Sequence, residues 1–295
     1  MNTDIFVATH KPAKFLLSEE YKWIQVNALA TGAWEGYLHD SDGVGQISSD
    51  NSSFCELTAL HRLWKMSNAS YKGLVHYRRF LGNRLRYSNS ELSGIKYKKE
   101  ELVNKVLKSN LIGKVLKDYD IILPRPLYPY PLTALEDLRR FVYERDIEEL
   151  TNVVHETYPD YFECFKSVLK ETNLSYCNIF VAPREISDSY CEWLFGLLKV
   201  LKERIDISGY DAQHKRVFGY LGEVLLNVYV RKNQLRPCYL NMIDLDENAE
   251  PLSFKRKLML KRFAILARLG HYPNYFDPAL GRARNKHYHR LIQKK

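Results

Sequence analysis

YKGLVHYRRF, residues 71–80, begins as a buried strand and ends in a cluster of charged and polar side chains. Gly73-Leu74-Val75 is a short apolar run, which is typical of a strand inside a sheet. His76-Tyr77-Arg78-Arg79 follows directly and carries two guanidinium groups that are always charged. Charged residues are mostly exposed, which favours surface positions where the strand emerges. The alternative is a phosphate-bearing ligand, because guanidinium groups match phosphate in charge and geometry.

Apolar patterns elsewhere predict an alternation of strands and helices. Continuous apolar runs predict further strands over residues 4–8, 119–124 and 178–183. Helical spacing of apolar residues predicts a helix capped by Ser52 or Ser53. It also predicts helical regions over residues 134–171, 190–201 and 217–228, and the region 134–171 is interrupted at 158–160. Residues 31–53 are interpreted as a long irregular loop and residues 88–118 as an exposed helical connection. This alternation predicts an α/β domain with a mainly parallel central sheet flanked by helices.

Polar side chains follow the ends of several predicted strands. They comprise Thr9, His10, Lys11, the loop residues Asp42 and Ser48, then His76, Tyr77, Arg78, Arg79, Arg125 and the segment 206–223. Because ligands bind beyond the carboxyl ends of parallel strands, we expect these residues to converge on one edge of the sheet. Simpler interpretations exist for four of them. His10 and Lys11 can form a turn before a proline, Asp42 can be an ordinary loop residue, and His76 can be a hydrogen-bonded structural residue.

Two carboxylates in the last third of the chain are candidates for proton transfer. Asp211 lies in a predicted loop, where it is either a helix cap or a chemical group. Glu223 lies between Leu221 and Val224 on a helix that is otherwise apolar, and a buried carboxylate needs a partner or a function. That partner can be Arg78, Arg79 or Arg216, which would make Glu223 structural.

Motifs and composition exclude several classes of protein. The chain has no Walker loop, no GxGxxG after a strand, no HExxH and no GxSxG, which argues against hydride transfer, P-loop chemistry and serine hydrolysis. Its five cysteines are scattered without a CxxC pair, which argues against a disulfide framework or a zinc site and favours a reducing compartment. The first residues, MNTDIFVATHKP, contain an apolar run that is too short for a signal peptide, and no segment of the sequence resembles a membrane span. We therefore expect a cytoplasmic protein.

The positive charge of the chain is concentrated at its carboxyl end. Residues 251–295 contain twelve Lys or Arg and one acid, a net charge of +11, whereas the whole chain carries +9, so residues 1–250 carry −2. Apolar residues are interleaved with these charges, which suits an anionic membrane surface better than nucleic acid. A solvated basic helix is the simpler alternative. We predict a domain over residues 1–250 and a basic, helical, membrane-associating tail over 251–295.

Several blocks of the sequence together resemble one family. YKGLVHYRRF, CELTALHRLWK, YDIILPRP, NIFVAPREISDSYCEWLF and RIDISGYDAQHKRVFGYLGEVLLNVY occur in the order found in the DUF4422 family of bacterial surface-polysaccharide proteins. The resemblance covers roughly residues 3–235. It implies a GT-A-like glycosyltransferase, and some members are associated with galactofuranose transfer.

The resemblance also implies how the opening stretch is used. Many GT-A enzymes place an Asp-x-Asp motif at this strand end to hold a divalent metal, whereas here the position is occupied by His76-Tyr77-Arg78-Arg79. Arginines can neutralise a UDP leaving group directly, so we expect no metal and no cofactor besides the UDP-sugar substrate. We assign donor binding to Thr9, His10, Lys11, Asp42, Ser48, His76, Tyr77, Arg78 and Arg79, and catalysis to Asp211 and Glu223, which can accept the proton of the acceptor hydroxyl.

The expected activity is transfer of a sugar to a lipid-linked oligosaccharide in capsule, exopolysaccharide or O-antigen synthesis. The expected partners are the nucleotide-sugar donor, the lipid-linked acceptor and the inner face of the plasma membrane, with no nucleic acid. The alternative is a non-catalytic glycan-binding or scaffold protein of the same assembly complex.

Overall fold

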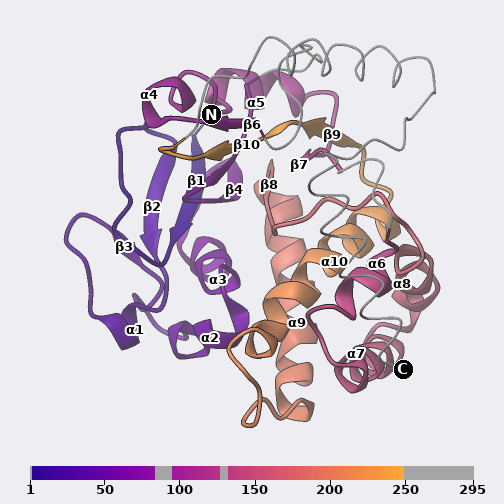
Figure 1. The fold of residues 1–295 in the computed structure, drawn as a ribbon. Coiled ribbons are helices and arrows are strands. Elements are labelled where there is room, and N and C mark those ends of the chain that lie inside the picture. The colour runs from indigo at the N-terminus through magenta and orange to yellow at the C-terminus, as the bar shows by residue number, and fades with distance from the viewer. Residues whose placement is uncertain (1, 84–94, 127–131, 249–295) are drawn as a thin grey trace. The chain divides into compact units, whose positions relative to one another are not determined.

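A computed structural model describes residues 2–83, 95–126 and 132–248 of the chain. Within these residues ten strands form one mixed sheet. One half of the sheet is parallel, in the order β3 (Leu38–His39), β2 (Tyr21–Gln25), β1 (Thr3–Thr9) and β4 (Tyr71–His76). The strands β1 and β4 are almost entirely buried, as their continuous apolar runs predict, because both faces of this half are covered. Figure 1 shows β1, β2 and β4 side by side.

The other half of the sheet begins at β4 and contains antiparallel pairs. Strand β8 (Phe180–Pro183) runs antiparallel to β4, and β7 (Ile121–Pro124) then pairs with β8 and, in parallel, with β9 (Pro237–Leu240). A branch leaves the end of β4, where the chain turns back at Tyr77 and Arg78 into β5 (Arg79–Leu81). The branch continues through β10 (Met242–Leu245) to β6 (Ile95–Tyr97). The arginine pair therefore lies at a hairpin turn at the carboxyl end of a central strand.

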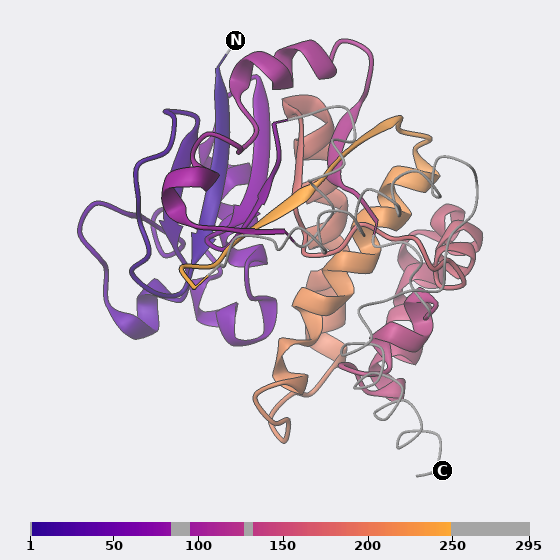
Figure 2. The same ribbon diagram turned by 45° about the horizontal axis from the view of Figure 1, so that its top comes forward.

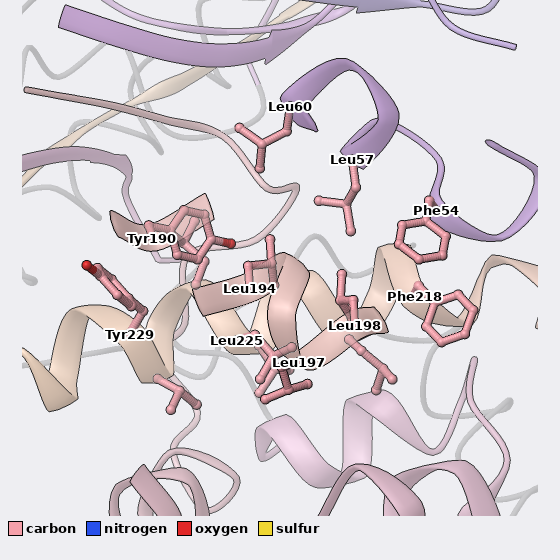
Figure 3. Packing of buried hydrophobic residues seen from close by; sticks show 14 of the residues in the cluster. Phe54, Leu57, Leu60, Tyr190, Leu194, Leu197, Leu198, Phe218, Leu225 and Tyr229 are labelled. Carbon is pink, nitrogen blue, oxygen red and sulfur yellow. The ribbon is translucent and has the colours of Figure 1, made fainter. Parts of the chain in front are cut away.

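Three helices pack the main core against one face of the sheet. Helix α3 (Leu57–Met66) packs on β1 and β4, and α9 (Arg184–Arg204) packs on β4 and β8. Helix α10 (Val217–Lys232) lies beside α9 in Figures 1 and 2 and contacts it directly. Figure 3 shows side chains from these three helices meeting, among them Leu57, Leu194 and Leu225, all with no exposed surface. Burial of this apolar surface provides most of the favourable free energy of folding.

Seven further helices lie in the described residues. They are α1 (Ala28–Thr31), α2 (Asn51–Phe54), α4 (Lys99–Leu102), α5 (Ser109–Val115), α6 (Ala134–Leu138), α7 (Glu144–Thr157) and α8 (Phe162–Val168), with 3₁₀ turns at Ser48–Asp50, Pro159–Tyr161 and His214–Arg216. No helix in the described part of the chain has the length and apolar character needed to cross a membrane. The proposed tail, residues 251–295, lies outside the described residues.

Most of the predicted elements are present, and the α/β class with a mainly parallel central sheet is confirmed. The helix expected to start at Ser52 or Ser53 is instead two helices, because Cys55 adopts a left-handed backbone with φ of 52° that ends α2. Glu56 is the N-cap of the second helix, α3. The connection predicted to be an exposed helix contains a strand and two short helices whose apolar residues, such as Leu102 and Ile112, are buried.

Candidate active site

The hairpin between β4 and β5 places Tyr77 and Arg78 at the carboxyl edge of the parallel half of the sheet. The Tyr77 N–H donates to the Ala8 carbonyl at 3.1 Å, and the Arg78 carbonyl accepts from Leu245 at 2.8 Å. The turn is thus tied to β1 on one side and to β10 on the other. The residues that follow β1 lie next to it, because β1 and β4 are parallel neighbours.

Tyr77 forms the centre of this edge. Its ring is buried, with 7% of its surface exposed, and the His10 ring meets it edge-on with 5.1 Å between centroids. The Lys11 ammonium lies 5.4 Å from the ring centroid and the Arg78 guanidinium 5.0 Å from it. A tyrosine ring attracts cations through its negative face, so Tyr77 holds two positive side chains beside each other.

Four cations gather at this edge and constitute the cationic cluster: Lys11, Arg78, Arg79 and Arg216. All four side chains are exposed. Burial and then the positive charges of Lys11, Arg78 and Arg216 lower the pKa of His10. These three cations therefore lie near the His10 ring. Within the described residues none of the four lies within 4.0 Å of a carboxylate. An unpaired group of cations is favourable where an anionic ligand completes it.

Three carboxylates lie close to the cationic cluster: Glu56, Glu223 and Asp244. Desolvation, followed by the negative charge of Glu56, raises the pKa of Glu223 to about 8, although the Cys177 backbone and Arg79 act in the opposite direction. Glu223 is therefore protonated at neutral pH. Desolvation also raises the pKa of Asp244, which lies opposite Arg79 in the β10–β5 register.

The turn before β8 holds the acidic side of the site in place. Cys177 and Asn178 both have left-handed backbones, with φ of 74° and 52°, which is uncommon for residues other than glycine. Cys177 forms backbone hydrogen bonds with Glu223 and His76, and its sulfur lies 3.6 Å from Arg79 Nη1. Such backbone conformations persist where surrounding contacts enforce them, and they concentrate at functional sites.

Some predicted donor-binding residues also have hydrogen-bond partners within the protein. The Thr9 hydroxyl donates to the Lys11 carbonyl at 2.6 Å and so shapes the turn after β1. Ser48 is fully buried and donates to Asp40 Oδ1 at 2.5 Å. Asp42 accepts from the His39 N–H at 3.2 Å in the same loop. These three side chains organise the loops that border the site.

Asp211 and Arg125 are also engaged outside the cationic cluster. Asp211 Oδ1 accepts from the backbone N–H groups of Gln213 and His214, at 2.8 and 2.9 Å, and these bonds lower its pKa. Its other oxygen lies 2.6 Å from His214 Nδ1. Arg125 donates to Asn241 and to the Tyr239 carbonyl. The structure thus brings together His10, Lys11, His76, Tyr77, Arg78, Arg79 and Glu223, and gives Asp211 the position of a helix cap.

The sequence did not reveal the parts that Glu56, Cys177, Asn178 and Asp244 have in this site. Each is brought to the site by contacts between segments distant in the chain. No pattern in the sequence distinguishes Glu56 from other acidic residues, and its neighbour Cys55 gives no sign of the break between α2 and α3. Among the described residues, no group of three or more His, Cys, Asp or Glu side chains is arranged to hold a metal ion.

The comparisons with known proteins agree with this architecture. Among solved structures, the apo form of the bifunctional glycosyltransferase WbbM is similar, with a TM-score of 0.74 and 27% sequence identity. The match covers 86% of this chain and 48% of that chain, so the chain spans about half the length of WbbM. The fold is therefore that of a glycosyltransferase. The model of DUF4422, a domain of unknown function, matches residues 4–234, and the chain belongs to this family. No curated protein matches the chain.

Proposed function

We propose that the protein transfers a sugar from a UDP-sugar to a lipid-linked oligosaccharide in the synthesis of a bacterial surface polysaccharide, with galactofuranose as a candidate sugar. The observation that carries this proposal is the cationic cluster at the carboxyl edge of the sheet, whose four exposed cations have no carboxylate within 4.0 Å among the described residues. Its combination with a glycosyltransferase fold and a nearby group of carboxylates supports donor binding and proton transfer at one place.

The cationic cluster supplies the electrostatic part of the reaction. As the bond between the sugar and the diphosphate breaks, negative charge accumulates on the departing UDP. Arg78 and Arg79 at the hairpin, with Lys11 and Arg216 beside them, can neutralise that charge. We propose that they replace the divalent metal that an Asp-x-Asp motif would hold, so that binding and turnover survive EDTA.

The proposal is tested by measuring thermal stability in the presence of uridine, UDP and a panel of UDP-sugars. A ligand that binds only the folded state raises the melting temperature, and at equal concentration the tighter ligand raises it more, with the logarithm of its affinity. We expect UDP and at least one UDP-sugar to raise it clearly more than uridine does, because only the phosphates need the cationic cluster. Equal shifts with UDP and uridine would contradict the proposal. UDP binding without UDP release in the presence of bacterial membranes would favour the non-catalytic scaffold.

We further propose that residues 251–295 hold the protein on the inner face of the plasma membrane, where a lipid-linked acceptor is located. The support is their net charge of +11 in a segment with interleaved apolar residues. Deleting these residues is expected to abolish sedimentation with vesicles that contain anionic lipid and to leave UDP binding unchanged. Neutral vesicles serve as the control. If the shortened and the full-length proteins bind anionic vesicles equally, the tail has a different role.

A further inference from the structure

Glu56 is the carboxylate at the centre of the site. It lies between α2 and α3, and its side chain is only 12% exposed. The charge of Glu56 influences the pKa of groups from five other segments, in keeping with its central position among them. These groups are His76 of β4, Arg79 of β5, Cys177 before β8, Tyr190 of α9, and Arg216, Tyr220 and Glu223 at the start of α10, besides its neighbour Cys55.

The Glu56 carboxyl group is held by a hydrogen bond from a buried amide. Asn178 Nδ2 donates to Glu56 Oε1 at 2.7 Å and to the Gly219 carbonyl of α10 at 3.0 Å. One amide therefore joins the strained turn before β8, the start of α3 and the first turn of α10. A carboxylate oxygen can accept more than one hydrogen bond, so the bond from Asn178 fixes the Glu56 carboxyl group without exhausting its capacity as an acceptor.

Two glycines of α10 permit this close arrangement. A Cβ atom at Gly219 would lie 3.2 Å from the Cys55 side chain, and one at Gly222 would lie 3.0 Å from both Asn178 Oδ1 and Leu57 Cδ1. The residue that follows them, Glu223, is thereby brought near Glu56. Burial and then the negative charge of Glu56 raise the pKa of Glu223 to about 8, which favours its protonated form at neutral pH.

His76 completes the surroundings of Glu56. Its Nε2 atom is buried, has no hydrogen-bond partner among the described residues and lies 3.8 Å from Glu56 Oε1. Burial lowers the pKa of His76, and the charges of Arg79 and Arg216 add to this effect, whereas the negative charge of Glu56 opposes it. A buried polar atom without a partner is costly, and a hydroxyl group placed between His76 and Glu56 would satisfy it.

We propose that Glu56 is the general base of the transfer reaction. This inference rests on the proposed function and applies to transfer with inversion at the anomeric carbon. The acceptor hydroxyl gives its proton to a Glu56 carboxyl oxygen while its oxygen forms a bond to the anomeric carbon. The bond from that carbon to the diphosphate breaks, and its electron pair leaves with UDP, next to the cationic cluster. Asp211 is engaged in capping, and Glu223 already holds a proton, so neither is free for this step.

The experiment compares Glu56→Gln with Asp211→Asn, Glu223→Gln and a control, Glu148→Gln, which changes an exposed residue of α7. UDP release is measured with bacterial membranes as the acceptor source and with the UDP-sugar that binds best. A general base contributes about 100-fold or more to the rate, so Glu56→Gln should lower kcat by at least about 100-fold. UDP affinity should stay the same or increase, because a negative charge near the cationic cluster has been removed. Glu56→Asp keeps the carboxylate but shortens the side chain by one methylene group, and its kcat should fall by about tenfold or more. This variant is used in place of Glu56→Gln if the glutamine variant fails to fold.

A readout that does not depend on turnover tests the arrangement itself. The pKa of Glu223, followed by carbon NMR, should fall in Glu56→Gln, since the adjacent negative charge has disappeared. If wild-type and Glu56→Gln release UDP at similar rates, the assignment of Glu56 is overturned and the proposed function stands. If Asp211→Asn alone loses activity, the base is Asp211. If the wild-type protein neither binds UDP nor releases it, the proposed function falls, and the base assignment falls with it.

Discussion

Replacing Arg78 and Arg79 together with alanine is expected to weaken UDP binding by about 100-fold or more. A hydrogen bond to a charged group contributes about 1.5–3 kcal/mol, and each 1.4 kcal/mol corresponds to a factor of ten in affinity. Binding of uridine should change little, because uridine has no phosphate. Lysine at both positions should restore the affinity in part, since it keeps the charge but lacks the planar donor geometry of arginine. Calorimetric titration with UDP and uridine measures all of these effects.

A matched control is available in Arg184. This arginine is also exposed. It directly follows Pro183 of β8, which pairs with Tyr71 at the start of β4, so it lies at the opposite end of β4 from the hairpin arginines. Arg184→Ala should leave UDP binding unchanged. Normal UDP affinity in the double variant would show that the hairpin arginines are only surface residues. Activity that disappears with EDTA and returns with manganese would show that a divalent metal, and not these arginines, neutralises the diphosphate.

Asp40→Ala is expected to destabilise the protein by about 3–5 kcal/mol, because several donors lose their acceptor at once and each buried donor without a partner costs about 1–3 kcal/mol. Asp40 is 1% exposed and accepts hydrogen bonds from four donors. These are the backbone N–H groups of Asn27 and Ala28, at 2.8 and 3.1 Å, and the hydroxyls of Ser48 and Thr58, at 2.5 and 2.6 Å. Without the carboxylate, two N–H groups lose their acceptor in a buried position, and the loop between β2 and α2 loses its central contact.

Urea unfolding monitored by circular dichroism measures this effect. The control is Asp42→Ala, two residues further on, which is only partly buried and should change the free energy of unfolding by less than about 0.5 kcal/mol. A similar small change for both variants would mean that water replaces the Asp40 carboxylate without cost. That result would contradict the structural role that we give to this loop.

The sequence predicted the parts of the fold that depend on local patterns. Phe6 and Val7 lie in a continuous apolar run, and so do Leu74 and Val75, and each run became a central strand with both faces covered. The helices α9 and α10 were predicted from their regular apolar spacing. Polar residues that follow β1 and β4 were expected to converge, and the structure places His10 and Lys11 next to Tyr77 for the reason given, since β1 and β4 are parallel neighbours.

The acidic side of the site was not predictable in the same way. Glu56 and Glu223 are separated by more than half of the chain, and they meet because a strained turn at Cys177 and Asn178 and two glycines of α10 allow close packing. No periodic pattern encodes such contacts. The break at Cys55 has the same origin, since a left-handed backbone at a cysteine is imposed by tertiary packing and not by local preference.

The hairpin at Tyr77 and Arg78 also affects the entropy of ligand binding. Its backbone is joined to β1 through the Tyr77 N–H and to β10 through the Arg78 carbonyl, so the turn is already ordered before any ligand arrives. Binding of the proposed diphosphate at this turn would then have to immobilise the side-chain torsions of the arginines, at about 0.5–1.5 kcal/mol for each side chain, on a backbone that is already ordered. The main-chain hydrogen bonds thus hold the turn that carries the arginines in one conformation, although the like charges repel one another in the free protein.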